Sequence, residues 1–300
     1  MDKYYLYPTT NSAAGFKVWK SDNLVDWTDR GLAFDRKLSG NEWRTGSFWA
    51  PEVVHHEDWF YMTYSARKED GTLKIRIARS SSPLGPFVNY SEPFLDDDAF
   101  SYIDGHILFD GDEIFMYYVK DSSHNVINGD HISQIFVVKL NDDLTAFDGK
   151  SELCIQPDQV WESLNANYQW NEGPFVLEED GTYYMFYSAN LYSSRNYSIG
   201  YATADNPYGP WTKYSGNPIL KKDESLKVSR PDHCSITLSP DSTEYFMVYH
   251  THTNYENPSG NRNVCIDRLQ FDEVGVPNVI GPTRTTQELP NGVEYRLLKK

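Results

Sequence analysis

The sequence has few cysteines and no long apolar run. Its three cysteines, Cys154, Cys234 and Cys265, are scattered along the chain and no CxxC spacing occurs. This excludes a disulfide framework and a cysteine-based zinc site, and it favours cysteines that serve as small buried side chains. No segment approaches the roughly 18 consecutive apolar residues that span a bilayer, so the sequence predicts no transmembrane segment.

Positive charge is also scarce. The 27 Lys and Arg residues face 43 Asp and Glu residues, which gives a formal charge of −16. Phosphate backbones and anionic membrane surfaces attract a surplus of Lys and Arg, so we expect neither a nucleic-acid nor a membrane partner. No signal peptide is visible at the N-terminus. The compartment therefore stays open between the cytoplasm and secretion of a protein whose N-terminus is missing here.

Aromatic residues, in contrast, are abundant. They make up 15% of the chain, with 22 Tyr, 15 Phe and 8 Trp, and such side chains suit both β-strands and sugar rings. A strand-like run rich in tyrosine and phenylalanine recurs five times, each time after a turn-like acidic or glycine cluster. A second strand-like segment follows each copy after a polar loop. The five runs are residues 4–7, 60–64, 115–119, 183–187 and 245–249.

This repetition predicts an all-β fold, and specifically a five-bladed β-propeller. Short strands with regular turn signals are typical of all-β proteins, and periods of roughly 50 residues with several strands each are typical of propeller blades. A β-sandwich with accidentally similar hairpins is the alternative. No linker or low-complexity tract divides the chain, so we expect residues 1–300 to form a single domain.

The candidate site follows from the geometry of a propeller, whose innermost strands meet at one mouth of a central channel. The segments just before four of the repeats, residues 48–53, 101–107, 171–176 and 231–236, place ionisable groups in apolar surroundings. Isolated buried charges are costly, so such groups are usually paired, protonated or part of a solvated pocket. The convergence of Asp104, Glu172 and His233 from three blades therefore predicts a functional site.

These segments together resemble glycoside hydrolase family 43 over almost the whole chain. The resemblance implies an inverting five-bladed propeller enzyme that releases arabinofuranosyl or xylosyl units from plant cell-wall polysaccharides or oligosaccharides. The matching residues are Trp49-Ala50-Pro51-Glu52-Val53, Ile103-Asp104, Trp161-Glu162, Glu172-Gly173-Pro174, and His233 with Ser235.

The resemblance implies catalytic roles for two carboxyl groups. Glu172 would be the general acid that protonates the leaving glycosidic oxygen. Asp104 would raise the pKa of that acid and orient it, which is physically sensible because a nearby negative charge keeps a carboxyl group protonated near neutral pH.

The resemblance also implies binding roles. Trp49 would offer an apolar face to the sugar, and Arg262 would hydrogen-bond a sugar hydroxyl, although a solvated loop arginine explains Arg262 equally well. Glu52 is a further candidate for substrate binding. No cofactor is expected, but His233 would face a calcium ion or another hydrated cation on the propeller axis and bind it through water.

Three departures from the family pattern concern residues beside the site. Gly105 stands where the family has proline after the aspartate. Asp232 and Cys234 replace the glycine and asparagine that flank the family's histidine, which puts cation binding in question.

A fourth departure concerns the general base. The family's base is an aspartate in an Asp-Pro segment about ten residues before the first Tyr-Tyr run, but that run begins here at Tyr4 and the chain contains no Asp-Pro dipeptide. The first blade is therefore expected to lack its innermost strand, unless residues 294–298 complete a blade. With an unpaired strand edge, we expect lower thermal stability than in a version extended at the N-terminus.

Inversion needs a carboxylate roughly 6.5–9.5 Å from the acid to activate water. Three explanations stay open: a shortened chain with little or no activity, a substitute carboxylate such as Glu52, or sugar binding without turnover. The functional hypothesis is an α-L-arabinofuranosidase or β-xylosidase with an unassigned base. The alternative is a non-catalytic or weakly active carbohydrate-binding propeller.

Overall fold

The structure is a computed structural model, which describes residues 3–11, 13–38, 44–164, 167–258 and 261–293. Within these ranges the chain forms β-strands and a single 3-10 turn, Val160–Glu162, with no α-helix. This confirms the predicted all-β class. No helix in the described ranges is long and apolar enough to cross a membrane. The strand expected at residues 294–298 lies outside them.

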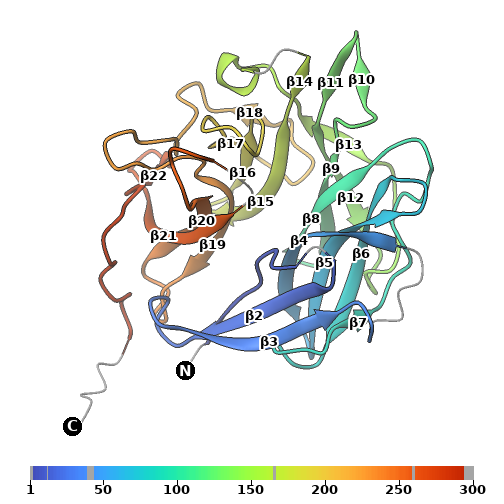
Figure 1. Cartoon of the computed structure of the whole chain (residues 1–300), viewed down its shortest axis with the longest axis horizontal. Coiled ribbons are helices and arrows are strands. Elements are labelled where there is room, and N and C mark those ends of the chain that lie inside the picture. The colour runs from blue at the N-terminus through green and yellow to red at the C-terminus, as the bar shows by residue number, and fades with distance from the viewer. Residues whose placement is uncertain (1–2, 12, 39–43, 165–166, 259–260, 294–300) are drawn as a thin grey trace.

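Four sheets each contain four antiparallel strands (Figure 1). The second sheet consists of β4 (Arg44–His56), β5 (Trp59–Lys68), β6 (Leu73–Ser80) and β7 (Val88–Asn89). The third consists of β8 (Tyr102–Asp110), β9 (Glu113–Lys120), β12 (Gln134–Leu140) and β13 (Glu152–Ile155). The fourth consists of β15 (Asn171–Glu179), β16 (Thr182–Ala189), β17 (Ser198–Ala204) and β18 (Thr212–Lys213). The fifth consists of β19 (Asp232–Leu238), β20 (Tyr245–His252), β21 (Arg262–Phe271) and β22 (Pro277–Val279).

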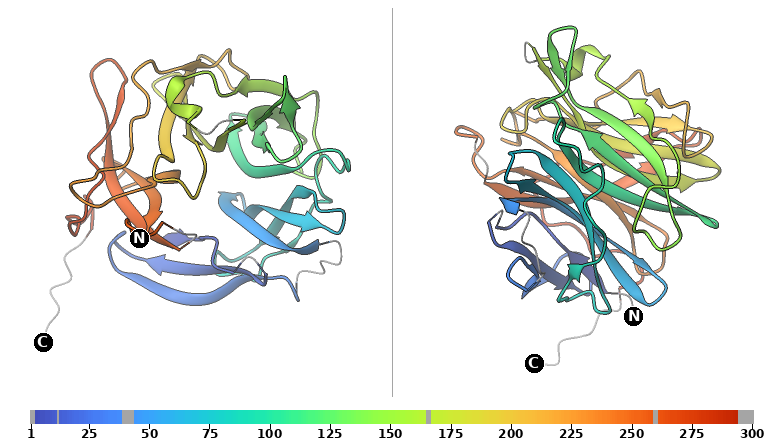
Figure 2. Two further views of the ribbon diagram at one scale, coloured as in Figure 1. Left: turned by 45° about the horizontal axis from the view of Figure 1, so that its top comes forward. Right: turned by 90° about the vertical axis from the view of Figure 1, so that its right-hand side faces the viewer.

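Two smaller sheets complete the described structure. The first sheet has three strands, β1 (Tyr4–Leu6), β2 (Gly15–Ser21) and β3 (Trp27–Asp35). A minor sheet joins β10 (Val126–Ile127), β11 (Asp130–Ile132) and β14 (Tyr168–Gln169). The described residues thus form six sheets. The main sheets follow one another in chain order around the molecule, which brings the first beside the fifth (Figure 2).

The repeated aromatic runs form corresponding strands, β1, β5, β9, β16 and β20. In the four-stranded sheets this strand is the second, and it pairs with an inner strand on one side and an outer strand on the other. In the first sheet it is β1, an edge strand that pairs only with β2 among the described residues. The expectation that the first blade lacks its innermost strand stays a prediction.

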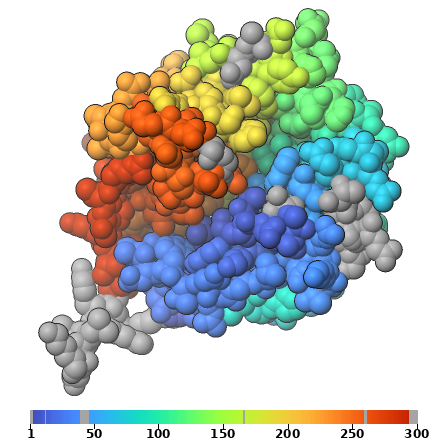
Figure 3. All heavy atoms as spheres, viewed as in Figure 1, coloured from blue at the N-terminus to red at the C-terminus, as the bar shows by residue number. Residues whose placement is uncertain are grey.

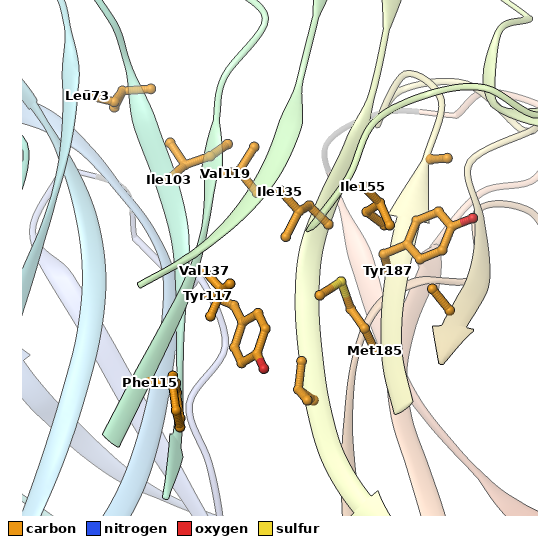
Figure 4. Close-up of a cluster of buried hydrophobic side chains, with 13 residues drawn as sticks. Leu73, Ile103, Phe115, Tyr117, Val119, Ile135, Val137, Ile155, Met185 and Tyr187 are labelled. Carbon is orange, nitrogen blue, oxygen red and sulfur yellow. The ribbon is translucent and has the colours of Figure 1, made fainter. Parts of the chain in front are cut away.

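The hydrophobic core lies between neighbouring sheets. Between the third and fourth sheets, Phe115, Tyr117 and Val119 of β9 face Met185 and Tyr187 of β16, and all five are at most 1% exposed (Figure 4). Similar clusters fill the interfaces between the first and second, second and third, and fourth and fifth sheets. Alternating apolar positions on the strands supply these side chains.

The first and fifth sheets meet differently. Their atoms abut on the surface (Figure 3), and the Tyr4 hydroxyl donates a hydrogen bond to the Leu238 carbonyl oxygen at 2.8 Å. Between and beside these sheets lies a cavity of about 1240 Å³, whose walls come from the inner strands β4, β8, β15 and β19, from residues 5–10 and from residues 283–288. We refer to the boundary between the first and fifth sheets as the seam.

Candidate active site

All four described inner strands carry a β-bulge, which lies near the first residues of β8, β15 and β19 and in the middle of the longer β4. In β8, for example, Ile103 pairs with Val119 and His106 with Tyr117, so two residues lie opposite one. Corresponding shifts occur in β4, β15 and β19. Bulges re-aim side chains and are common next to active sites. Here they turn residues from separate sheets toward the same end of the channel.

Three of the bulges contain a residue with positive φ, namely Asp104 at 56°, Gly173 at 59° and His233 at 47°. Glycine is favoured at position 173 for two reasons. Its φ favours glycine, and a Cβ atom there would lie 3.1 Å from Nδ1 of His233. The turned backbone therefore allows the His233 ring to pack directly against the strand that carries Glu172.

Side chains of the preceding sheet accept the bulge N–H groups. The Asp104 N–H donates to the Ser65 hydroxyl at 3.3 Å, and the His233 N–H donates to the Ser188 hydroxyl at 2.8 Å. The Gly173 N–H instead donates to Oδ2 of Asp104 at 3.0 Å. In the third sheet, the equivalent position in the strand register is Val119, whose side chain has no acceptor. The Asp104 carboxylate therefore anchors the residue that follows Glu172.

The expected pair of carboxyl groups thus comes together. Asp104 lines the cavity and is 9% exposed, and Glu172 is partly exposed, so neither is sealed within packed protein. The residue after Glu172, Gly173, lines the cavity, and the hydroxyl of buried Tyr197 donates a hydrogen bond to the Oε1 atom of Glu172. Tyr197 was not foreseen from the sequence, because only the tertiary structure brings the loop before β17 to this point.

Protein surroundings shift the titration of both carboxyl groups. Burial raises the pKa of Glu172 well above its ordinary value, the Asp104 charge raises it further, and the Tyr197 hydrogen bond acts in the opposite direction. Burial also raises the pKa of Asp104. His233 and the Gly173 N–H act in the opposite direction, because both favour the charged form of Asp104. One proton shared between the two groups is best held by Glu172, because Asp104 has more partners that stabilise a negative charge.

A cluster of charged and imidazole groups adjoins this pair at the start of β19. Asp232 is fully buried, with Oδ2 at 3.3 Å from Nε of Arg230 and Oδ1 at 2.5 Å from Nδ1 of His250. These ion-pair contacts lack hydrogen-bond geometry, and the described residues offer no hydrogen-bond partner to the Asp232 oxygens or to Nε of Arg230. Burial raises the pKa of Asp232 to about 7, although Arg230 favours the carboxylate. Arg262 extends the cluster to the cavity, with Nη1 at 3.1 Å from Nε2 of His250.

Glu52 lies farther along the channel. Its Oε1 atom is 2.5 Å from Nδ1 of His106, and Nε2 of His106 accepts the Val176 N–H at 3.0 Å. These contacts link β4, β8 and β15. The Glu52 carboxylate lines the cavity but is engaged by histidine, which suits holding strands together better than activating water.

The remaining predicted residues are distributed around the mouth. Trp49 begins the bulge of β4 and is partly buried against the cluster between the third and fourth sheets, outside the cavity wall. Arg262 is exposed at the start of β21 and lines the cavity.

His233 lines the cavity, and its ring lies 6.2 Å from that of His250. In the described ranges no three His, Cys, Asp or Glu side chains are arranged to hold a metal ion. The hydrated cation expected to bind His233 through water stays a prediction.

Comparison with known proteins identifies the family. Residues 1–277 match glycosyl hydrolases family 43, and the chain belongs to that family. A solved thermostable family-43 glycoside hydrolase is 54% identical, covers 97% of this chain and 93% of its own, and superimposes with a TM-score of 0.94. An endo-1,4-beta-xylanase structure from Bacteroides thetaiotaomicron is 31% identical over 93% of this chain and 91% of its own, with a TM-score of 0.80.

A curated relative is the beta-D-galactofuranosidase xynD of Aspergillus niger, which is 27% identical over 99% of this chain and 82% of its own length. An extracellular exo-alpha-(1->5)-L-arabinofuranosidase of Streptomyces avermitilis is 25% identical over 77% of this chain and 49% of its own length. The relatives thus include enzymes named for galactofuranosyl and arabinofuranosyl substrates, and others named for xylosyl substrates. The chain is accordingly a glycoside hydrolase by family and a carbohydrate-active protein by substrate class.

Proposed function

We propose that the protein is an inverting glycosidase that releases arabinofuranosyl or xylosyl units from plant cell-wall polysaccharides or oligosaccharides. The observation that carries this proposal is the pairing of Glu172 with Asp104 at the mouth of the cavity. The Asp104 carboxylate accepts the N–H of the residue next to Glu172, and burial together with the Asp104 charge keeps Glu172 protonated.

In this reaction the Glu172 carboxyl donates its proton to the glycosidic oxygen as the bond to the anomeric carbon breaks. Water adds to that carbon from the opposite face, and its proton passes to a base. Among the described residues the base is unassigned. Glu52 is the substitute considered from the sequence, and its short contact with His106 makes it a poor one.

The five main sheets support a five-bladed propeller in a single domain over residues 1–300. Four of them share the same strand order, and the three-stranded first sheet lies beside the fifth. A single cooperative unfolding transition, coincident by circular dichroism and tyrosine fluorescence, is expected of one domain, whereas two separated transitions would contradict it.

The substitution Glu172→Gln tests the acid assignment. General acid catalysis typically contributes about 10²–10⁴-fold, so kcat/KM on an alkyl or natural glycoside, whose leaving group needs protonation, should fall by that factor. An aryl glycoside with a strongly acidic leaving group should lose far less. The matched control is Glu178→Gln, a carboxylate farther along the same strand, β15. Equal rates for wild type and Glu172→Gln on the alkyl glycoside would refute the assignment.

A non-catalytic carbohydrate-binding propeller is the second candidate, and the unassigned base favours it. Calorimetry with arabino- and xylo-oligosaccharides, followed by product analysis over several days, separates the two. Binding without product supports the second candidate, and release of a sugar with inverted anomeric configuration supports the first.

A further inference from the structure

A stack of three rings stands on the minor sheet. The imidazole of His131 on β11 lies parallel to the ring of Tyr168 on β14, with centroids 4.3 Å apart and planes 8° apart. Trp170 stacks on Tyr168 at 5.7 Å and 20°. His131 and Tyr168 are direct neighbours in the register of the two strands, so the minor sheet itself holds this arrangement.

The stack lies at the mouth end of the channel. Residues 121–133 connect the end of β9 to the start of β12, and β14 ends one residue before β15 begins. Both connections leave the third and fourth sheets at the end where Asp104 and Glu172 lie. Figure 1 shows β10, β11 and β14 projecting together beyond the main sheets. Tyr168 is 42% exposed there, and Val126 on β10 is 53% exposed.

The stack leads along the chain to the proposed general acid. Alternate residues of an extended chain share a face, and the stacked rings of Tyr168 and Trp170 follow this alternation. Glu172 is the next residue in the series. At a rise of about 3.3 Å per residue, Tyr168 lies about 13 Å along the chain from Glu172, which is the reach of a short oligosaccharide.

The direction of this path decides which part of a substrate could follow it. The acid contacts the leaving oxygen, so rings that extend outward from the acid lie on the leaving-group side of the scissile bond. The rings are flat and carry polar edges, and this combination suits neutral sugar rings. In the described ranges, Trp170 and His131 each stack with Tyr168 only and so keep one ring face without an aromatic partner.

We propose that His131, Tyr168 and Trp170 form a binding platform for the sugars on the leaving-group side of a pentose-based polysaccharide chain. This platform rests on the proposed function, because it assumes that Glu172 protonates the leaving oxygen. With such a platform the enzyme acts on polymers or long oligosaccharides. The backbone of the polysaccharide lies along the minor sheet while one of its sugars enters the cavity.

The test compares a polymer with a small substrate. We would measure kcat/KM on arabinoxylan and on an aryl arabinofuranoside or aryl xyloside for wild type, Tyr168→Ala and His131→Ala. For each variant the ratio of polymer to aryl substrate should fall roughly three- to tenfold, because the aryl substrate is too short to reach the rings. A ratio equal to that of wild type in both variants overturns the proposal.

The matched control is His56→Ala. His56 stacks on Phe109 at 4.1 Å and 11°, but this pair joins the far ends of β4 and β8, away from the mouth. Its polymer-to-aryl ratio should equal that of wild type. A fall as large as that of His131→Ala would mean that loss of any stacked histidine has the same effect, and would overturn the platform.

Affinity electrophoresis in gels containing arabinoxylan separates the platform from the hydrolase proposal. Wild type should be retarded, and Tyr168→Ala should migrate faster than wild type. If wild type is retarded but hydrolyses none of the substrates, the hydrolase proposal fails while the platform stands. If wild type and Tyr168→Ala are retarded equally, the platform fails whatever the activity.

Discussion

The interface between the third and fourth sheets and the seam between the fifth and first sheets are built in opposite ways. The interface between the third and fourth sheets contains a dense cluster of side chains such as Tyr117, Met185 and Tyr187. At its mouth end, the Asp104 carboxylate accepts a hydrogen bond from the Gly173 N–H, next to Glu172. Among the described residues the seam has no such cluster; the Tyr4 hydrogen bond crosses it, and it borders a cavity of about 1240 Å³ that the inner strands of the other sheets also line. The half of the mouth that holds the proposed acid is thus fixed by packing.

The difference also bears on catalysis. An acid must be held accurately to protonate a leaving oxygen, and rigid packing below it provides that accuracy. The base of an inverting enzyme lies on the other side of the sugar. The cavity extends toward the seam, so the open side of the mouth is the region in which a base and its water would act.

The largest expected effect comes from emptying the packed interface. Met185 is fully buried, and Met185→Ala should lower the free energy of unfolding by about 2–5 kcal/mol, because a cavity remains where the side chain was. Val248→Ala, which removes a partly buried side chain from the cavity wall, should cost less. Urea denaturation measures both. Equal losses would show that the seam is packed as tightly as the interface.

A smaller effect is expected from Ser188, whose hydroxyl accepts the N–H of the His233 bulge. Ser188→Ala leaves that N–H without its acceptor and should cost about 1–3 kcal/mol of unfolding free energy. Ser188→Thr retains a hydroxyl and serves as the control for loss of the acceptor. A stability of Ser188→Ala equal to that of wild type would mean that the hydrogen bond does not hold the bulge.

The Asp104 charge should affect the pH profile of activity. The proposed acid works in its protonated form, so activity is lost as pH rises through the pKa of Glu172. The Asp104 charge raises that pKa, so Asp104→Asn should move the basic limb of kcat/KM to lower pH. The matched control is Glu288→Gln, a carboxylate on the seam side of the same cavity, which should leave the limb in place. If Asp104→Asn leaves the basic limb in place, the Asp104 charge does not influence the pKa of Glu172.

The smallest effect is expected at the seam itself. Tyr4→Phe removes the hydroxyl that bonds the Leu238 carbonyl oxygen and should cost about 0.5–1.5 kcal/mol by thermal or urea denaturation. Tyr5→Phe, in the neighbouring residue of β1, is the control for loss of a hydroxyl alone. A loss as large as that of Met185→Ala would mean that this contact carries the closure of the molecule.

Much of the fold was accessible to sequence reasoning because local patterns specify it. The tyrosine-rich runs have the composition of strands, and turn residues punctuate them, so β5, β9, β16 and β20 and their partner strands were predictable. The segments around Asp104, Glu172 and His233 stood out because ionisable groups interrupt apolar stretches, and all three lie at the bulged ends of inner strands. The minor sheet was not foreseen, since its short strands lie within loops.

The strand class, the repeat and the family can be recognised without coordinates, because they depend on composition and on the order of residues along the chain. The tertiary structure alone decided which groups meet. The Tyr197 hydroxyl on Glu172, the His106 ring on Glu52 and the His250 ring beside Asp232 come from different strands or loops of the chain. No local pattern encodes these contacts, because they depend on how strands pair, on how sheets pack against one another and on how each bulge turns a side chain toward the channel.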